Sequence, residues 1–449
     1  MIVLKFGGTS VGDAAAIRRL VAIAGVALPE RPLVVVSAMA RVTNALLALE
    51  ELLAEGDLDQ AAEACNALCL RHEGTALELG LGAEATGALA QLCDELRGLV
   101  VAAIGQSSTA ARRDLVAGFG EALSSRLVAG AFATAGLPAS WFDARDVIAT
   151  NDQFGGALPD VAGIRLAAVE QLAPLLAAGR LVVTQGFVGR AADGRPTTLG
   201  RGGSDFSAAL LGAALAAERV EIWTDVDGLM SADPRIVPEA RLLAHASYDE
   251  AAELAAFGAK VLHPATQLPL VEAEIPIVIR NTFAPEHPGT WIRSGDSEVG
   301  ESPIRSISFK PGVTVVQIRA PRMLGAYGFL RRIFEVFERH QIVVDVLATS
   351  EVSVSLTIDD ATRLPAVVVD LAAVGEVVVR PGRGVIAVVG RGIRETPGIA
   401  ARVYGAIADV NVEMISQGAS ASNLTFIVQE QDGPAVVRAL HRTFFPGTR

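Results

Sequence analysis

The 449-residue sequence is poor in charged residues and has no basic stripe. Charged side chains make up 20% of the chain, and the formal net charge is −12. Because proteins that bind nucleic acids usually gather lysine and arginine on one face, we expect no nucleic-acid partner. An acidic chain that binds anions must collect its few cations locally, so lysines and arginines beside glycine loops become informative.

The sequence also lacks segments that would direct or anchor it to a membrane. The N-terminal stretch MIVLKFGG has no basic region followed by an apolar one, so no signal peptide is predicted. The longest uncharged apolar run, Phe206–Ala217, is too short to cross a bilayer. We therefore expect a soluble, cytoplasmic protein without a membrane partner.

Cysteine is scarce, with only Cys65, Cys69 and Cys93. Three unpaired thiols fit a reducing cytosol. Cys65, Cys69 and His72 could share one helix face and bind zinc, but no fourth ligand lies nearby in the sequence. Thiols in the core of an apolar helix are the simpler interpretation.

The apolar residues indicate an α/β fold. They make up 51% of the chain, and its length predicts two to four domains of about 100–200 residues each. Strands are expected at residues 2–6, 33–37, 181–184 and 220–224, with helices at 14–26, 161–178 and 206–217. This alternation predicts a mostly parallel sheet sandwiched by helices. Residues from about 44 to 117 are nearly all helix-like and predict a helical insertion.

The last third of the chain repeats itself after a Pro-, Gly- and Ser-rich linker at 285–302. With an offset of 70 residues, Gly328 aligns with Gly398, and 31 positions align without a gap. Two unrelated α+β halves are the alternative, and the gap-free match disfavours it, so we expect two βαββαβ modules. The predicted units are a catalytic domain (1–290), a linker (291–303) and modules at 304–384 and 385–449; strand 304–309 could pair within the second module.

A lysine and two glycines end the first predicted strand, in the stretch Lys5-Phe6-Gly7-Gly8. Adjacent glycines let backbone N–H groups approach an anion, a following helix start adds a positive dipole end, and Lys5 adds a full charge. A plain turn with a solvated lysine is the alternative. The lysine precedes the glycines, unlike in a P-loop, and the GxGxxG of a dinucleotide dehydrogenase is missing.

A second glycine loop, TLGRGGSD at 198–205, directly precedes the predicted helix 206–217. Ser204 or Asp205 could cap this helix, but a cap alone would not need Arg201 among three glycines. Two such helix starts in one α/β domain indicate sites for a nucleoside triphosphate and an anionic acceptor.

Two further segments place charged residues near predicted element ends. WTDVDG at 223–228 follows a strand, at the edge where open α/β sheets bind ligands, although Asp227-Gly228 alone is an ordinary turn. Arg235 follows it, as does Lys260 at a predicted helix end, where a cation also favours the dipole. Glu121 is expected at a helix start, where it could stabilise the dipole or bind a ligand ammonium.

Together the motifs resemble the aspartate kinases over nearly the whole chain. They are KFGGTSV at 5–11, FDARDVIATNDQFGGALPD at 142–160, TLGRGGSD, WTDVDG and FGAKVLHPAT at 257–266, and the duplicated tail resembles the paired ACT domains of monofunctional, lysine-sensitive members. The resemblance implies the amino acid kinase fold and transfer of the ATP γ-phosphoryl group to the β-carboxylate of L-aspartate, the first step toward lysine, threonine and methionine. It also implies a homodimer or higher homo-oligomer formed through the ACT modules.

The same resemblance implies residue roles. Lys5, Asp205 and Lys260 would be catalytic. ATP would be bound by Lys5, Gly7, Gly8, Thr224, Asp225, Met230, Arg235, Lys260 and Val261. Aspartate would be bound by Thr43, Glu121, Arg201, Gly202 and Ser204, with Arg201 on a carboxylate and Glu121 on the ammonium. Mg²⁺ would be held through ATP, with no protein ligand. Met230 stands where relatives often carry tyrosine.

Lysine is the implied effector, at the first ACT module. Its site would comprise Met323, Leu324, Ala326, Gly328, Phe329, Leu330, Val343, Val344, Asp345, Ser350 and Glu351. A glycine-bearing loop before a helix could receive the carboxylate, and Asp345, expected on the next strand, and Glu351 could meet the two ammonium groups of lysine. Val343 replaces a serine common in relatives, so lysine could bind more weakly or another effector could substitute.

Two alternatives remain open. A non-catalytic amino-acid sensor would need only the paired modules and would have no use for Lys5, Arg201 or Asp205. A kinase for another acceptor, such as acetylglutamate, would act on a blocked amine and would have no use for Glu121.

Overall fold

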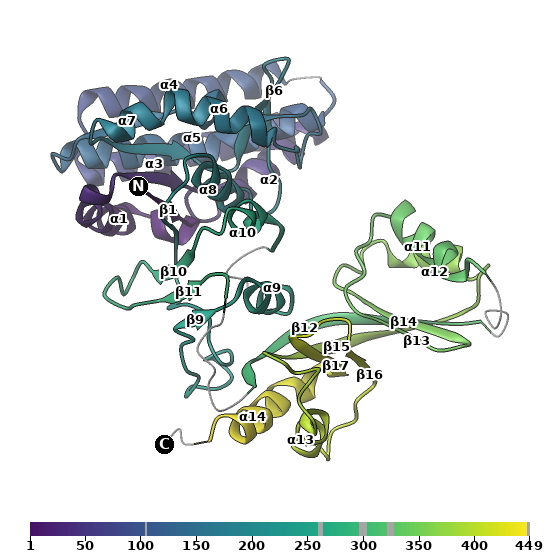
Figure 1. Ribbon diagram of the computed structural model, residues 1–449. Helices are drawn as coiled ribbons and strands as arrows, with labels where there is room; N and C mark the ends of the chain where they lie inside the picture. The colour runs from purple at the N-terminus through teal and green to yellow at the C-terminus, as the bar shows by residue number, and fades with distance from the viewer. Residues whose placement is uncertain (104–105, 259–263, 296–302, 321–326, 447–449) are drawn as a thin grey trace. The chain divides into compact units, whose positions relative to one another are not determined.

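The computed structural model describes residues 1–103, 106–258, 264–295, 303–320 and 327–446 (Figure 1). The chain forms two compact units. The first comprises residues 1–229, 244–248 and 261–295, and the second comprises 230–243, 249–260 and 296–449. The units are discontinuous, so they differ from the predicted single boundary near residue 290.

The first unit contains the predicted alternation of strands and helices. Its elements are β1 (Ile2–Phe6), η1 (Gly8–Val11), α1 (Ala14–Val26), η2 (Leu28–Glu30), β2 (Pro32–Val36), α2 (Val42–Glu55), α3 (Leu58–Leu79), α4 (Ala83–Ala102), α5 (Ala110–Thr134), β3 (Ala139–Phe142), η3 (Ala144–Asp146), β4 (Ala149–Thr150), α6 (Val161–Gln171), α7 (Ala173–Ala177), β5 (Leu181–Gln185), β6 (Val188–Ala191), β7 (Pro196–Thr198), α8 (Gly203–Ala214), β8 (Val220–Thr224), β9 (His245–Ala246), η4 (Pro264–Gln267), α10 (Leu268–Glu272), β10 (Ile277–Asn281) and β11 (Thr290–Ile292).

Eight of these strands form one sheet in the order β3-β5-β2-β1-β8-β10-β11-β9. All neighbours pair in parallel except β10 and β11, which are antiparallel. Every residue of β1, β2 and β5 is buried, as expected for parallel strands that helices cover on both faces. A smaller sheet joins β4, β6 and β7. The predicted fold class is confirmed.

The two faces of β1 pack against different helices. Ile2, Leu4 and Phe6 belong to the core that α1 and α5 share with the sheet. The intervening residues face α8, where Gly212 packs beside Val3. Because side chains alternate along a strand, Lys5 lies on the α8 face, and the ammonium it carries meets the start of that helix.

The predicted helical insertion consists of α2, α3, α4 and the beginning of α5, and α5 packs against the strands β2, β3 and β5. By length and composition, helix α5 could cross a membrane. Most of its apolar stretch is buried inside the protein, however, as in the core helix of a folded domain. Cys65, Cys69 and Cys93 are buried in the same core, and none forms a disulfide. In the described part of the chain, no group of three or more His, Cys, Asp or Glu side chains is placed to hold a metal ion.

The second unit contains α9 (Tyr248–Ala256, from its second residue) and the repeated modules. Their elements are β12 (Ile304–Arg319), α11 (Phe329–Arg339), β13 (Leu347–Thr349), β14 (Ser353–Ile358), α12 (Leu364–Leu371), β15 (Glu376–Gly390), α13 (Ile399–Gly405), β16 (Met414–Gln417), β17 (Asn423–Gln429), η6 (Glu430–Asp432) and α14 (Gly433–Phe444). The strands form one sheet in the order β13-β14-β12-β15-β17-β16.

Two long strands are shared by both modules. The second half of β12 pairs with β14 and with the first half of β15, whereas residues 304–310 pair with 385–390, next to β17. Each module also has its own core, one under α11 and α12 and the other under α13 and α14. The modules are therefore joined through continuous backbone rather than through a flexible linker.

Residues 230–243 pack on the second module rather than with the sheet of the first unit. Ile307 donates its backbone N–H to the carbonyl of Ser231 at 2.9 Å, and the Ser231 hydroxyl lies 2.9 Å from His441 Nε2 of α14. Ala232 and Val237 belong to the apolar core around α14. The segment that follows the WTDVDG motif is thus part of the core of the second unit.

Candidate active site

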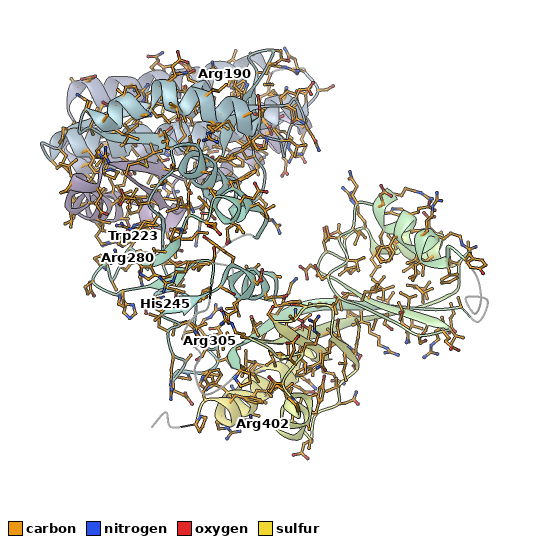
Figure 2. The ribbon with its side chains drawn as sticks, in the orientation of Figure 1. Arg190, Trp223, His245, Arg280, Arg305 and Arg402 are labelled. Carbon is orange, nitrogen blue, oxygen red and sulfur yellow. The ribbon has the colours of Figure 1, made fainter. Side chains whose placement is uncertain are left out.

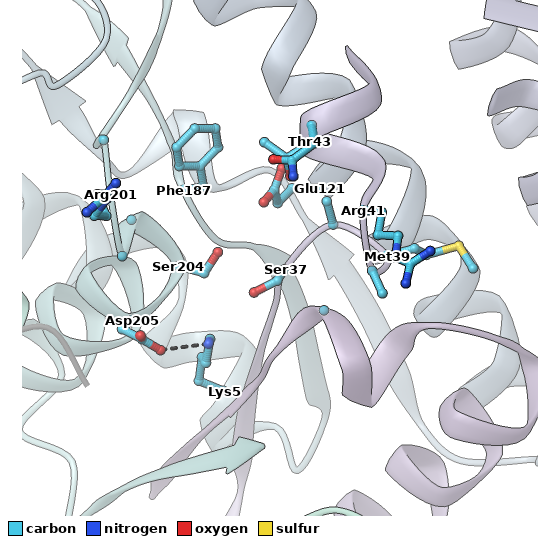
Figure 3. A pocket seen from close by; sticks show the side chains of 17 residues that line it. Lys5, Ser37, Met39, Arg41, Thr43, Glu121, Phe187, Arg201, Ser204 and Asp205 are labelled. Carbon is cyan, nitrogen blue, oxygen red and sulfur yellow. Dashed lines mark ion pairs between the residues drawn. The ribbon is translucent and has the colours of Figure 1, made fainter. Parts of the chain in front are cut away.

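A cavity of about 430 Å³ opens in the first unit, at the edge where β1 and β2 end (Figure 3). Open α/β sheets bind ligands at this edge because loops and helix starts converge there. The cavity is lined by Lys5, Gly8, Ser37, Ala38, Met39, Ala40, Arg41, Thr43, Asn44, Glu121, Phe187, Gly200, Arg201, Gly202, Gly203, Ser204 and Asp205. All five residues predicted to bind aspartate are among them.

Lys5 and Asp205 form an ion pair at one end of this cavity. Lys5 Nζ lies 2.7 Å from Asp205 Oδ1, as the dashed line in Figure 3 shows. Lys5 comes from β1, and Asp205 from the first turn of α8. The structure therefore brings together two of the three predicted catalytic residues. The third, Lys260, lies outside the described residues, as does the predicted ATP ligand Val261.

The two glycines after Lys5 differ in their surroundings. Gly8 lines the cavity, and a Cβ atom there would lie only 3.0 Å from the Ala38 carbonyl oxygen, so the close approach of the two loops requires glycine. The N–H of Gly7 already donates to the Trp223 carbonyl at 3.1 Å. The glycines lead into a four-residue 3₁₀ turn, Gly8–Val11, and α1 begins at Ala14, as expected.

The TLGRGGSD loop leads into α8 through two left-handed glycines. Gly200 has φ 75° and Gly202 has φ 72°, values that side-chain-bearing residues rarely adopt. Gly202 is the N-cap, and α8 starts at Gly203 rather than at Phe206. The expectation that Ser204 or Asp205 caps the helix is wrong, because both lie inside its first turn. They present their side chains to the cavity instead.

Glu121 lies in the middle of α5, not at a helix start as expected, because that helix begins at Ala110 with Thr109 as its N-cap. Its carboxylate is buried, and Oε2 has no hydrogen-bond partner in the structure. Burial raises its pKa to about 8, although a backbone bond from Ala38 and the nearby charge of Lys5 oppose the shift. A buried carboxyl group with an unused oxygen is well suited to receive a ligand cation.

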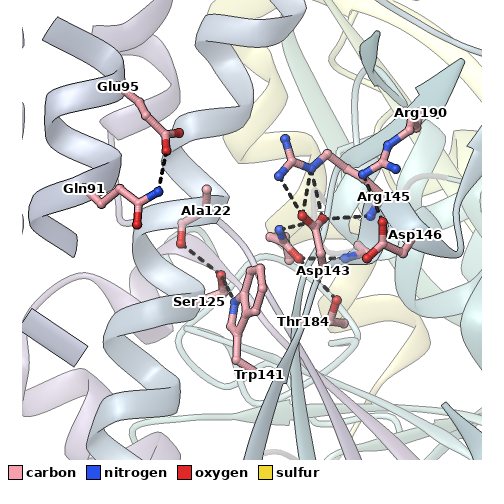
Figure 4. Close-up of polar contacts among 12 residues, drawn as sticks. Gln91, Glu95, Ala122, Ser125, Trp141, Asp143, Arg145, Asp146, Thr184 and Arg190 are labelled. Atoms are coloured by element: carbon pink, nitrogen blue, oxygen red, sulfur yellow. Dashed lines mark hydrogen bonds and ion pairs between the residues drawn. The ribbon is translucent and has the colours of Figure 1, made fainter. Parts of the chain in front are cut away.

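Hydrogen bonds connect the segment 142–160 to Gln185, the last residue of β5 (Figure 4). Asp143 accepts from Arg145 Nη2 at 2.6 Å and from Gln185 Nε2 at 3.1 Å, and Gln185 in turn accepts from the N–H of Ala144 at 2.8 Å. Burial would raise the pKa of Asp143, but the bonds from Arg145 and Gln185 outweigh it and lower the pKa. The network fixes η3 beside the sheet.

The described ATP residues predicted beyond Gly8, namely Thr224, Asp225, Met230 and Arg235, lie outside the cavity lining. Thr224 ends β8, and its hydroxyl donates to Asp225 at 3.2 Å. The preceding Trp223 is covered by the guanidinium of Arg280, 4.7 Å from the ring centroid (Figure 2). Met230 and Arg235 belong to the second unit, where Arg235 is 89% exposed and pairs with Asp233 at 2.7 Å.

The predicted effector residues lie in the first module. Gly328 is the left-handed N-cap of α11, followed by Phe329 and Leu330. Asp345 precedes β13 rather than lying on a strand, and it is 3.3 Å from Lys310 Nζ. Val343 is 76% exposed. Val344 precedes β13, and Ser350 and Glu351 follow it. Met323, Leu324 and Ala326 lie outside the described residues.

The sequence did not identify the loop between β2 and α2 as part of the site. Ser37, Ala38, Met39, Ala40 and Arg41 all line the cavity, and Arg41 adopts a left-handed conformation with φ 70°. The loop directly follows a fully buried strand, and that position at the carboxyl edge was the available signal. Asn44 and Phe187 were also missed, and neither stands in a recognisable motif.

Comparison with known proteins agrees with this geometry. Residues 1–281 match the amino acid kinase family, and residues 386–444 match an ACT domain. The chain is 38% identical to lysine-sensitive aspartokinase 3 of Escherichia coli (99% of both chains) and 36% identical to the chloroplastic aspartokinase 1 of Arabidopsis thaliana (99% of this chain and 80% of the relative).

Solved structures of the bacterial relative have the same fold. The structure of E. coli aspartokinase III with aspartate and ADP, in the R-state, matches with a TM-score of 0.85 at 37% identity, over 99% of this chain and 100% of the other. The structure with lysine and aspartate, in the T-state, also gives 0.85, at 38% identity over 99% of each chain. The chain therefore belongs to the aspartokinases, within the amino acid kinase family.

Proposed function

We propose that the chain transfers the γ-phosphoryl group of ATP to the β-carboxylate of L-aspartate and yields 4-phospho-L-aspartate. The observation that carries this proposal is the composition of one cavity. It combines the Lys5–Asp205 pair, the buried carboxyl group of Glu121 and the Arg201 loop. An amino acid with a free ammonium and two carboxylates offers a complement to each of these charges.

Aspartate is the acceptor that these side chains favour. Glu121 would bind the ammonium, because its Oε2 has no partner and lies away from water. Arg201 would bind a carboxylate with its planar guanidinium, and Thr43 and Ser204 add hydroxyl groups to the same cavity. N-acetylglutamate carries no ammonium and would leave Glu121 without a partner.

The reaction needs no general base. The side chain of aspartate has an ordinary pKa of about 3.9, so the nucleophile is already ionised at neutral pH. The obstacle is repulsion between this carboxylate and the phosphates, since two unit charges at 4 Å repel by about 4 kcal/mol at an effective dielectric constant of 20. Lys5 would neutralise part of this charge, and it would stabilise the in-line transfer most where negative charge accumulates.

The nucleotide is proposed to bind as its Mg²⁺ complex. Within the described ranges no cluster of three or more potential metal ligands exists, so the ion would be held mainly by phosphate oxygens and water. Asp205 is the acidic residue at this end of the cavity, and it would orient Lys5 and the cation's water shell. Gly7, Thr224 and Asp225 would contact the nucleotide, together with Met230, Arg235, Lys260 and Val261.

We further propose that lysine inhibits the enzyme from the first module and that the modules join two or more copies in the cytoplasm. The E. coli relative is called lysine-sensitive and has been solved with lysine bound. The strands β12 and β15 run through both modules, and this continuity supports coupling between the first module and the second. Residues 230–243 pack on that module, and they include the predicted nucleotide ligands Met230 and Arg235.

A coupled assay that measures ADP release tests the proposal. Wild-type protein should turn over with aspartate, and glutamate and N-acetylglutamate should give little or no activity. Turnover with N-acetylglutamate in preference to aspartate would establish the other kinase activity. If the protein binds amino acids but releases no ADP from ATP with any acceptor, it is a non-catalytic sensor.

A further inference from the structure

A buried carboxylate that the proposed mechanism does not use lies on the same helix as Glu121. Asp114 is on α5, seven residues earlier in the sequence, and is 3% exposed. Seven residues are about two helical turns, so Asp114 and Glu121 project from the same face of α5. The side chain of Glu121 lines the cavity, and that of Asp114 accepts hydrogen bonds from the backbone that leads to the Arg201 loop.

Asp114 accepts four hydrogen bonds from two separate chain segments. The N–H of Thr198 donates to Oδ2 at 2.7 Å, and its hydroxyl donates to Oδ1 at 2.9 Å. The N–H of Gly155 donates to both oxygens at 3.0 Å. Hydrogen bonds to an ionised acceptor are about twice as strong as neutral ones, so this carboxylate holds both segments firmly against α5.

The two segments are also bonded to each other. Ala157 donates its N–H to the Thr198 carbonyl at 2.8 Å, and a Cβ atom on Gly200 would lie 3.2 Å from the Gly155 carbonyl oxygen. Thr198 is the last residue of β7, three residues before Arg201. Asp114 therefore ties the helix that carries Glu121 to the loop that carries Arg201.

We propose that Asp114 is a positioning residue that fixes the separation of Glu121 and the Arg201 loop and so selects the length of the acceptor. The proposal rests on the proposed function, in which Glu121 binds the ammonium and Arg201 a carboxylate. With Arg201 on the side-chain carboxylate, the two bound groups are separated by one more methylene in glutamate than in aspartate, whereas the ammonium and the α-carboxylate are equally spaced in both. A misplacement of about 1 Å can cost about a hundredfold in rate.

The variant Asp114→Asn tests the proposal. An amide replaces one accepting oxygen with a donor, and in either orientation this donor faces the N–H of Gly155, so we expect the loop to move. We expect the KM for aspartate to rise about tenfold or more and the KM for ATP to stay within about twofold. The preference for aspartate over glutamate in kcat/KM should fall by about tenfold.

Asp160→Asn is the matched control. It makes the same chemical change in the 142–160 segment, which contains the Asp114 partner Gly155. Among the bonds described, the Asp160 side chain accepts only from the N–H of Gly163, at 3.1 Å, as the N-cap of α6. Asparagine caps helices about as well as aspartate, so this variant should keep both KM values and the preference for aspartate. A purely structural loss at Asp114 would lower the active fraction and kcat without separating the two KM values.

A second variant decides the matter if Asp114→Asn does not fold. Thr198→Val removes only the hydroxyl bond to Asp114 and keeps the backbone bond, so it should change the aspartate KM and the preference in the same direction but less. If Thr198→Val or folded Asp114→Asn keeps the wild-type KM for aspartate and the wild-type preference for aspartate over glutamate, the role of Asp114 is overturned. A wild-type chain without aspartate turnover would overturn the proposed function, and this role with it.

Discussion

Lys5 Nζ and Asp205 Oδ1 lie 2.7 Å apart, with 10% of the lysine side chain and 16% of the aspartate side chain exposed. The pair joins the central strand of the sheet to the first turn of α8. Breaking a buried pair by removing one partner costs about 3–5 kcal/mol, because the remaining charge is left uncompensated. Loss of activity in a single variant could thus reflect either lost chemistry or lost stability.

The first prediction separates these two causes. Lys5→Met should lower kcat at least about a hundredfold, as loss of one transition-state donor does, and should also lower the melting temperature. The double variant Lys5→Met/Asp205→Asn removes both charges and should regain much of the stability but none of the activity. Calorimetry and the coupled ADP assay measure the two quantities. Activity of the double variant within about tenfold of wild type, about 1.4 kcal/mol, would contradict a transition-state role for Lys5.

The second prediction concerns the acceptor. Glutamine has the shape of glutamate but cannot carry a negative charge, so Glu121→Gln should weaken binding of the aspartate ammonium. We expect the KM for aspartate to rise at least about tenfold, with little change in the KM for ATP. Steady-state kinetics with each substrate varied in turn provide the measurement. Equal changes in both KM values, or none, would reduce Glu121 to a residue of the helix core.

The third prediction follows from the pKa of Glu121, which burial raises to about 8. In the empty cavity this carboxyl group is therefore mostly protonated at pH 7. An ammonium beside it favours the charged form, so aspartate binding should release up to one proton and should tighten as pH rises from 6 to 8. Titration calorimetry in buffers with different ionisation enthalpies counts the proton. Proton release that persists in Glu121→Gln would assign it to another group.

The fourth prediction applies the same shift to stability. The folded-state pKa of Glu121 lies above the ordinary glutamate value of 4.5, so between these two values the folded protein binds more protons than the unfolded chain. The contribution of Glu121 to stability is therefore complete below about pH 4.5 and is lost as pH rises toward 8. Glu121→Gln lacks this loss, so its melting temperature relative to wild type should be higher at pH 8 than at pH 6. A difference independent of pH would mean that Glu121 is ionised in the empty cavity.

The sequence predicted the sheet, the paired modules and both glycine loops because each has a local signal. Buried parallel strands read as β-branched runs, and glycines at strand ends indicate close backbone approach. Glu121 was misplaced because Gly120 resembled a helix boundary. In the structure α5 continues through Gly120, where a Cβ atom would lie 2.7 Å from the Ala38 Cβ. That glycine permits close packing, a cause that acts across the fold and leaves no local trace.

The position of residues 230–243 was not predictable for a related reason. No periodicity marks the segment, and its partners are distant in sequence: Ser306 donates to the Met230 carbonyl at 2.7 Å, and Val237 packs in the core around α14. Asp114 illustrates the same limit. Nothing near it in the sequence distinguishes its carboxylate from other acidic residues of α5 and α4. Its importance arises only when Gly155 and Thr198 are folded against it.

The proposed effector site contains a carboxylate that already has a cationic partner. Lys310 Nζ of β12 lies 3.3 Å from Asp345 Oδ2 and 2.5 Å from Asp359 Oδ2. Burial raises the pKa of Asp345; Lys310 opposes the shift, and Asp359 adds to it. An ammonium of bound lysine would have to share Asp345 with Lys310 or displace it, and Asp359 can retain Lys310 in either case.

The last prediction is that lysine inhibits wild-type enzyme and that Asp345→Ala relieves the inhibition with little change in uninhibited kcat. Asp370→Ala is the matched control in the same module, because Asp370 pairs with Arg339 and His340 rather than with Lys310, and it should leave inhibition intact. Since the pKa of Asp345 is raised, inhibition should weaken as pH falls and the carboxylate is protonated. Coupling between sites is reciprocal, so aspartate or ATP should weaken lysine binding by the factor by which lysine weakens theirs. Titration calorimetry that detects no lysine binding to wild type at millimolar concentration would contradict the effector assignment, and equal relief in Asp370→Ala would show that Asp345 acts only through the stability of the module.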